Sequence, residues 1–323
     1  MNDAVARKLL PWPLVGVIIG AVVISGSLAV VFFGPAMARP AVFGVLVGLF
    51  GCLFGDRTHA LAAAALALVA TAASLLAPDW ARFWLIIPAM AAALGWETAR
   101  TGSKALVFGV MSWIALIGPA SEGSFASVAI VFTLAMVCAL VLAIVLGIEG
   151  RIPKQPTGRS YGVSLAVGLA IGLSFAVLIA RQFGGAHADW IALMFVARAL
   201  DPPDAHQRKA LASGLATIGG AAAAGAALAA PLPAEVFKAA AAVLLVLGLR
   251  LLPARTPLAP ALISAAVIMG VAPEDGAAEF RILASAIAAG LVVGLSTAIE
   301  FIRAAVAPED AANSPGDNPP SQR

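Results

Sequence analysis

The chain has 323 residues, of which 61% are apolar and 11% are charged, and its mean hydropathy is +0.99. A soluble domain carries roughly 25% charged residues, so this chain has too little charge to keep a folded surface in water. The composition predicts a polytopic membrane protein. It excludes a soluble catalytic domain and a nucleotide-binding cassette, and the net charge of +3 does not indicate a nucleic-acid partner.

Apolar runs alternate with polar breaks at intervals close to 20 residues, the length of a helix that crosses the hydrocarbon. This spacing predicts an all-α transmembrane bundle of about twelve helices, with ten as the alternative because the fourth, fifth, eighth and eleventh runs are short. The first run is longer than the roughly 7 to 15 apolar residues of a signal peptide, which favours a retained helix. The runs are 14–33, 41–55, 59–76, 83–96, 105–117, 125–148, 161–180, 190–200, 210–230, 236–252, 258–271 and 280–302.

The Lys and Arg residues gather in alternate loops. With a cytoplasmic N-terminus and twelve crossings, fifteen of the 20 basic residues fall on the inner side and five on the outer side. Basic residues near helix ends are retained in the cytoplasm. The distribution therefore favours a cytoplasmic N-terminus and an even number of crossings. We expect a multi-pass protein of a bacterial inner membrane. The outer five are Arg39, Arg82, Arg181, Lys238 and Arg281.

A polar segment at 149–160 (EGRIPKQPTGRS) divides the chain into two membrane halves, 14–148 and 161–303. They are flanked by a cytoplasmic N-terminus, 1–13, and by a disordered tail, 304–323. Matches between the halves predict a duplicated six-helix unit, whose copies are parallel because six is even, with a substrate path at their interface. Tight Ala-Gly packing without a pore is the alternative. The main matches are the loop that begins at Asp56-Arg57 with the loop that begins at Asp204, Gly95 with Gly248, and Ile148-Glu149 with Ile299-Glu300.

Ionisable groups at membrane depth cost about 2.5 to 3.5 kcal/mol and therefore suggest functional sites. Glu97 and Arg250 end equivalent helices of the two halves, where they either pair with each other or extend into cytoplasmic water. Arg198 interrupts an apolar run, and its fork of donors suits a carboxylate. Glu300 shares a helix face with Arg303 and is the candidate for proton coupling. An interfacial ion pair is the alternative for Glu300.

Motifs for other chemistry are missing from the sequence. The three His residues lie in loops or at helix ends without a second ligand type nearby, so neither a metal nor a cofactor is predicted. A phosphate-binding loop, a catalytic triad and an HExxH pattern are all lacking, so the chain is not expected to be an enzyme. Cys52 and Cys138 lie in apolar runs and are expected to behave as small apolar residues.

The second half, 161–303, resembles the six-helix membrane module of the fusaric acid resistance family of aromatic acid exporters, which is related to plant aluminium-activated malate channels. A weaker echo of it occurs in the first half. The resemblance implies efflux of small organic, often aromatic, acids driven by the proton gradient, with Trp190 and Arg208 near the path. It rests on Tyr161, His187-Ala188-Asp189-Trp190, Asp201-Pro202-Pro203-Asp204, Arg208-Lys209, Thr217-Ile218-Gly219-Gly220 and Phe280-Arg281-Ile282-Leu283-Ala284.

Two functions are compatible with these patterns. The first is a secondary transporter that exports a small organic anion in exchange for protons. The second is a membrane scaffold or partner subunit that transports nothing, whose inner basic residues contact anionic lipid headgroups. Membrane lipids are partners in both cases, and homo-oligomerisation is left open.

Overall fold

The structure is a computed structural model that describes residues 9–152, 154, 158–183, 189–197, 206–254, 256–270 and 277–306. Every regular element in these ranges is helical, which confirms the predicted all-α fold, and twelve of the α-helices there have eight residues or more. These are α2 (Trp12–Phe33), α3 (Ala38–Phe54), α4 (Arg57–Leu76), α6 (Ile87–Thr101), α7 (Leu106–Glu122), α8 (Phe125–Val145), α9 (Gly158–Phe183), α10 (Trp190–Ala197), α11 (His206–Leu228), α12 (Ala234–Leu251), α13 (Leu258–Gly270) and α14 (Ala277–Val306). Short helical segments in the same ranges are η1 (Pro35–Met37), α5 (Asp79–Ala81), η2 (Arg82–Ile86) and η5 (Leu252–Ala254).

The helices differ in their capacity to cross a membrane. Six segments of the described chain are long and apolar enough to do so, namely α2, η1 with α3, α4, α8, α9 and α11. Two of the runs predicted to be short, 105–117 and 258–271, correspond to α7, with 17 residues, and α13, with 13. α10 has only 8 residues. At 1.5 Å per residue it covers about 12 Å, so it does not span the roughly 30 Å of hydrocarbon by itself.

The polar breaks end helices for identifiable reasons. The side chain of Asp56 accepts hydrogen bonds from the backbone N–H groups of Thr58 and His59, and so caps the start of α4. Gly102 follows α6 with a φ of 68°, a left-handed conformation that a side chain would strain. These residues explain why α4 and α6 begin and end at short breaks in the apolar pattern.

Glycine allows the closest helix pair of the first half to form. A Cβ at Gly48 of α3 would lie 2.6 Å from the carbonyl oxygen of Met136 and 2.7 Å from the Cβ of Ala139, both in α8. Gly44, one turn earlier, approaches the carbonyl oxygen of Phe132 in the same way. Small residues spaced by four let helix backbones touch, as in helix pairs within lipid.

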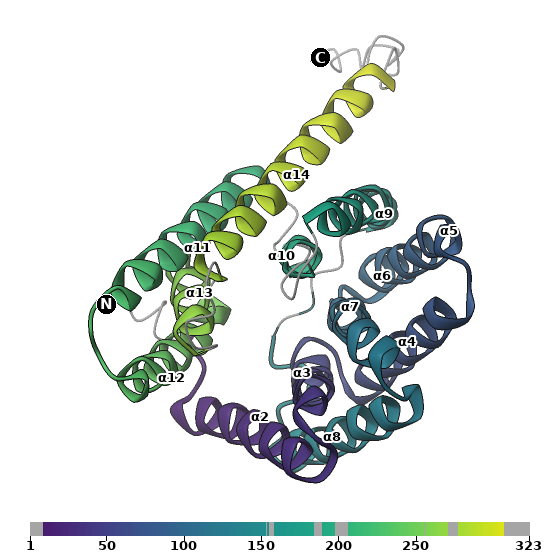
Figure 1. Cartoon of the computed structure of the whole chain (residues 1–323). Coiled ribbons are helices and arrows are strands. Elements are labelled where there is room, and N and C mark those ends of the chain that lie inside the picture. The colour runs from purple at the N-terminus through teal and green to yellow at the C-terminus, as the bar shows by residue number, and fades with distance from the viewer. Residues whose placement is uncertain are drawn as a thin grey trace, which may run out of the picture.

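The helices form two groups that are joined at two places. α2, α3, α4, α6, α7 and α8 make the first group, and α11, α12 and α13 make the second (Figure 1). The main apolar core lies in the first group and extends into α9 and α10. A small separate core of Ala221, Ala224, Ala265 and Ile268 lies between α11 and α13. α14 bridges the groups because it packs on α9, α10 and α11. α12 returns to α2, so the helices close a ring.

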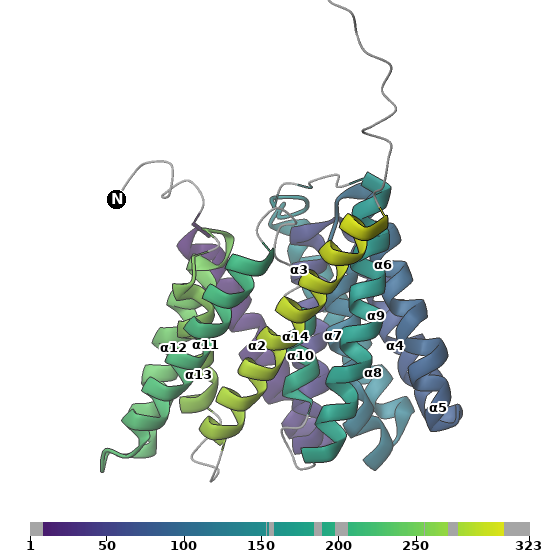
Figure 2. The same cartoon turned by 90° about the horizontal axis from the view of Figure 1, so that it is seen from above.

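α2 begins and α14 ends at the same end of the bundle (Figure 2). We call this the proximal end, and we call the opposite end, where α2 ends and α14 begins, the distal end. An even number of helices requires this arrangement, because each short connection reverses the direction of the chain. The predicted even count therefore agrees with where the two outermost helices lie.

The segment between the two predicted halves is attached to the first half. The N–H of Gly150 donates to the carbonyl oxygen of Cys52 at 2.9 Å, and the N–H of Ile152 donates to that of Leu53 at 3.1 Å. The helices run past two predicted boundaries, since α9 begins at Gly158 rather than at 161 and α14 continues to Val306 rather than ending at 303. Residues 307–323 of the predicted tail lie outside the described residues.

Large apolar side chains cover the outside of several helices. α8 exposes Leu134, Val137, Val141 and Val145 on successive turns, and α2 and α9 show the same kind of apolar surface. Soluble monomers rarely expose apolar patches larger than a few hundred Å². This surface suits contact with lipid chains, in agreement with the apolar helices.

Candidate functional site

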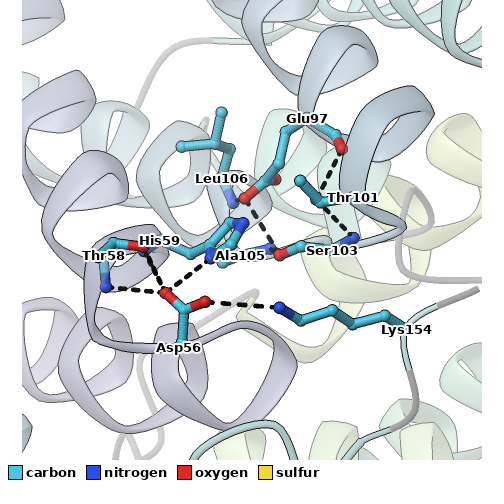
Figure 3. Close-up of polar contacts among 9 residues, drawn as sticks. All are labelled: Asp56, Thr58, His59, Glu97, Thr101, Ser103, Ala105, Leu106 and Lys154. Carbon is cyan, nitrogen blue, oxygen red and sulfur yellow. Dashed lines mark hydrogen bonds and ion pairs between the residues drawn. The ribbon is translucent and has the colours of Figure 1, made fainter. Parts of the chain in front are cut away.

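Glu97 is buried at the proximal end of α6, with 7% of its surface exposed. One carboxylate oxygen accepts a hydrogen bond from the Ser103 hydroxyl at 3.1 Å, and the other accepts from the backbone N–H of Leu106 at 3.0 Å (Figure 3). Leu106 opens α7, and the unpaired N–H groups of a helix start stabilise a carboxylate. Glu97 therefore ties the end of α6 to the start of α7 and does not extend into cytoplasmic water.

A second polar group lies next to Glu97 (Figure 3). Nδ1 of His59 lies 2.8 Å from Oδ1 of Asp56, and Nζ of Lys154 lies 3.5 Å from Oδ2. Burial raises the pKa of Asp56, but hydrogen bonds from Thr58 and His59 outweigh this and hold that pKa far below its usual range. His59 and Lys154 also act electrostatically on Glu97. These contacts fasten the 149–160 segment to the start of α4.

Arg250 does not meet Glu97. Its guanidinium lies over the ring of Trp12, 3.9 Å from the ring centroid, and its carbonyl oxygen accepts from the N–H of Leu10 at 3.2 Å. Among the described ion pairs none joins Glu97 to Arg250. The sequence placed these charges at equivalent helix ends, and the structure gives each of them a different partner.

The distal end holds a cation that the sequence assigned to an outer loop. Arg281 of α14 is 5% exposed, and its guanidinium lies 4.8 Å from the centroid of the Trp190 ring. Its Nε donates to the hydroxyl of Ser264 in α13 at 3.4 Å. One turn further along α14, the hydroxyl of Ser285 is buried and has no hydrogen-bond partner among the described residues. Since residues four apart share a helix face, α14 directs a guanidinium and a hydroxyl to the same side.

Further charges surround this group. Asp189, which precedes Trp190, forms an ion pair with Arg39 at the start of α3. On α9, Arg181 lies 3.3 Å from Asp79 and stacks over Phe83, with 4.9 Å to the ring centroid. All these contacts join helices that are far apart in the sequence. The distal end of the bundle is thus held together by arginines.

Three predicted site residues are less completely placed. Arg198 lies outside the described residues, as do the neighbouring residues 199–205. Arg208 lies in the helical backbone of α11 and Glu300 in that of α14, without a described side chain. Glu300 follows Arg281 by 19 residues, which is about 28 Å along a helix. Of the predicted residues whose side chains the structure describes, only Trp190 belongs to the distal polar group.

The sequence contained a signal for Arg281, which was not among the predicted site residues. Arg281 is the second residue of the apolar run 280–302, so it could have been counted as a charge inside a helix rather than in a loop. Its partners Ser264 and Trp190 are 17 and 91 residues away, and no local pattern joins them. Asp56 followed by Thr58 and His59 is a helix-capping pattern that could have been found from the sequence.

Comparisons of the chain with protein-family models, with curated proteins and with solved structures find no match. What the chain does therefore has to be inferred from the contacts of its own residues.

Proposed function

We propose that this protein is a multi-pass transporter of a bacterial inner membrane that exports small organic anions in exchange for protons. The observation that carries the proposal is the position of Arg281, a cation buried between α10, α13 and α14 against an indole ring. An ionisable side chain within apolar helices is costly and suggests a functional site. With the proximal end in the cytoplasm, Arg281 lies toward the outer side of the membrane.

The chemistry around Arg281 suits an amphipathic carboxylate. A guanidinium presents a planar fork of donors that matches a carboxylate. The hydroxyl of Ser264 in α13 and that of Ser285, one turn further along α14, add donors of hydrogen bonds. The indole of Trp190 supplies an aromatic face for the apolar part of a substrate. These features support small aromatic or amphipathic acids as the substrate class.

A parallel duplication supports transport in a second way. α6, the fourth long helix, packs on α9, the seventh, and α12, the tenth, meets α2, the first. Two parallel six-helix copies related by a twofold axis would make this pair of contacts equivalent. Transporters of this kind place their substrate path between the copies. The two contacts are therefore expected to border the path.

The resemblance to the fusaric acid resistance family agrees with this assignment, because the family likeness places Trp190 near the path and Trp190 contacts Arg281. Arg198 and Arg208 remain candidates for the cytoplasmic part of the route. Glu300 remains the candidate for proton coupling, since it belongs to the same helix as Arg281.

The first test is flux in proteoliposomes, measured for a panel of aromatic and aliphatic carboxylic acids with and without a pH gradient. Arg281→Gln should lower flux about 10- to 100-fold, the change expected when a hydrogen-bonded charge worth roughly 1.5 to 3 kcal/mol is lost. Arg151→Gln, which changes an exposed arginine outside both helix contacts, is the control and should transport normally. Glu300→Gln should abolish uphill efflux while downhill exchange continues.

Controls separate these effects from misfolding. Each variant is compared with the wild type by size-exclusion chromatography and thermal unfolding in detergent. The assignment of Arg281 is wrong if a folded Arg281→Gln protein transports at the normal rate. The assignment of Glu300 is wrong if uphill efflux survives in Glu300→Gln.

The scaffold function is the alternative, and one observation favours it. Glu97 and Arg250, two charges that the sequence selected as unusual, have structural partners at the proximal end. A scaffold would bind lipids through the basic residues of that end and would carry no flux of any acid in the panel. The same proteoliposome assay distinguishes the two functions.

A further inference from the structure

The ring of helices is closed at two places, and the first of them is tightly built. We call the contact between α6 and α9 the α6–α9 seam. A Cβ at Gly162 would lie 2.5 Å from both the Cβ of Ala99 and the carbonyl oxygen of Gly95, so the two backbones touch. At the distal end the same seam is held by Arg181 of α9, which contacts Asp79 and Phe83. The α6–α9 seam is therefore fixed in its proximal half and at its distal end.

The second place, the contact between α2 and α12, is built differently, and we call it the α2–α12 seam. Its polar contacts among the described residues are both at the proximal end, where the Arg250 guanidinium lies over Trp12 and the Arg250 carbonyl accepts from the N–H of Leu10. The buried residues of α2 are Leu14, Val15 and Ile18 in its proximal half, and only Ala29 in its distal half. The α2–α12 seam is thus closed at one end.

The distal half of α2 has few neighbours. Val31, Phe32 and Phe33 are 75%, 72% and 51% exposed, and these three side chains point to different sides because successive helix positions differ by about 100°. In α12, Val236 and Val243 are also exposed, while Phe237, Ala241 and Gly248 are buried. The distal half of α2 therefore has few contacts, and α12 packs on α13 at Ala241 as well as at Gly248.

We infer that the Trp12–Arg250 contact is a latch that holds the α2–α12 seam shut at the proximal end, and that releasing it lets the second helix group swing away from α2 about α14, which stays packed on α9, α10 and α11. α12 packs mainly on α13, and Leu244 of α12 packs on the small core between α11 and α13, so α12 can keep these contacts when it parts from α2. Leu249 of α12 and Leu252 of η5 also pack against the main apolar core, so opening the seam breaks the cation–π contact and exposes a few apolar side chains. The inference concerns motion and does not require that the protein be a transporter.

The test measures distances across the α2–α12 seam by double electron–electron resonance in lipid nanodiscs. Spin labels are attached in a Cys52→Ala, Cys138→Ser background. Gly16→Cys with Leu247→Cys reports on the proximal end, since a side chain at Gly16 meets no other atom within 4 Å and Leu247 is exposed. Val31→Cys with Val236→Cys reports on the distal end, where both residues are exposed.

In the wild type we expect a narrow proximal distance distribution. Arg250→Gln should raise the population of longer proximal distances by about 2- to 30-fold, the change that follows from losing one cation–π contact. Arg250→Lys keeps a cation and should give a smaller change, and Trp12→Phe, with a weaker ring, an intermediate one. Arg181→Gln is the matched control, because it removes an arginine–aromatic contact of the other seam, and it should leave the α2–α12 distances unchanged.

The outcomes are decisive in both directions. A graded widening of the proximal distances across Arg250→Lys, Trp12→Phe and Arg250→Gln supports the latch. If Arg250→Gln fails to fold, Arg250→Lys and Trp12→Phe still show whether a weaker contact lengthens the proximal distances. The latch is overturned if folded variants at both positions keep the wild-type proximal distribution. It is also overturned if Arg181→Gln widens the α2–α12 seam as much as Arg250→Gln does.

Discussion

At the scale of single residues, buried charges in this protein have specific partners. Glu97 is satisfied by the first backbone N–H of α7 and by a serine hydroxyl, and Arg250 lies over an indole face while its Nε has no hydrogen-bond partner among the described residues. Both charges stand out in the sequence because they interrupt apolar runs. Their partners do not stand out. Nothing in the sequence indicates that Glu97 binds the start of α7 or that Arg250 contacts a tryptophan 238 residues away. The interpretation of Glu97 as a residue of the substrate path therefore competes with a structural explanation.

One prediction tests the structural explanation of Glu97. Glu97→Gln keeps the shape of the side chain but replaces one acceptor oxygen with an amide NH₂, which faces a donor. We expect a loss of about 1 to 3 kcal/mol of stability, measured as a lower thermal unfolding midpoint in detergent. Glu122→Gln, at the exposed end of α7, is the control and should unfold like the wild type. Equal midpoints for the two variants would contradict the assigned role.

A second prediction concerns pH and Asp56. Its pKa in the folded protein is held far below the unfolded value of about 3.9, so its contribution to stability is complete above that value. As the pH falls below about 4, the contribution shrinks and disappears once the pH passes the folded pKa. Asn caps helices as well as Asp does, so Asp56→Asn removes the charge and keeps the cap. The variant should be less stable than the wild type at pH 7, with a smaller difference at pH 3.5.

The measurement for Asp56 is the difference in unfolding midpoint between wild type and Asp56→Asn across this pH range. Arg151, an exposed neighbour in the same segment, provides a control through Arg151→Gln, which should give a difference that does not depend on pH in this way. A gap between wild type and Asp56→Asn that grows on acidification would reverse the expected sign and refute the role of the carboxylate.

At the scale of elements, helix positions follow from the pattern of apolar runs and breaks. The runs at 14–33, 59–76 and 125–148 match α2, α4 and α8 closely because their ends carry a Gly or a capping Asp, whose effects are local. Helix ends are less well predicted where the chain stays apolar or helical past a charge. α9 and α14 extend beyond their predicted ends for this reason, since Arg159 and Arg303 do not interrupt a helix.

Packing of elements gives a third prediction, in which two glycines respond with opposite signs. Gly48→Ala forces a Cβ against the Met136 carbonyl and Ala139, and overpacking of this kind costs about 1 to 3 kcal/mol. Gly20→Ala in α2 meets no atom within 4 Å, and alanine favours helix over glycine by about 1 kcal/mol. Thermal unfolding should therefore show a lower midpoint for Gly48→Ala and an unchanged or higher one for Gly20→Ala. The packing explanation fails if both variants shift in the same direction.

At the scale of the whole molecule, the two seams decide what the bundle can do. The α6–α9 seam is a backbone contact through glycines, and the α2–α12 seam is a contact at one end through an arginine and a tryptophan. The sequence matched Gly95 with Gly248 as equivalent residues. In the structure Gly95 lies in the α6–α9 seam, whereas Gly248 packs against Ile263 of α13. If the two halves are parallel copies, they share the order of their helices but differ in how those helices pack.

The sequence by itself determined that the chain is helical and where most of its helices begin and end, and its prediction of about twelve helices agrees with the twelve long helices of the described residues. These properties depend on local apolar content, on capping residues and on glycine, which act within a few residues. Only the tertiary structure decided that Arg281 meets Trp190, that Arg250 meets Trp12 and that Glu97 caps α7. Such contacts depend on which helices become neighbours, and Ala- and Gly-rich surfaces allow many neighbours with similar packing energy, so the choice is made by the whole bundle.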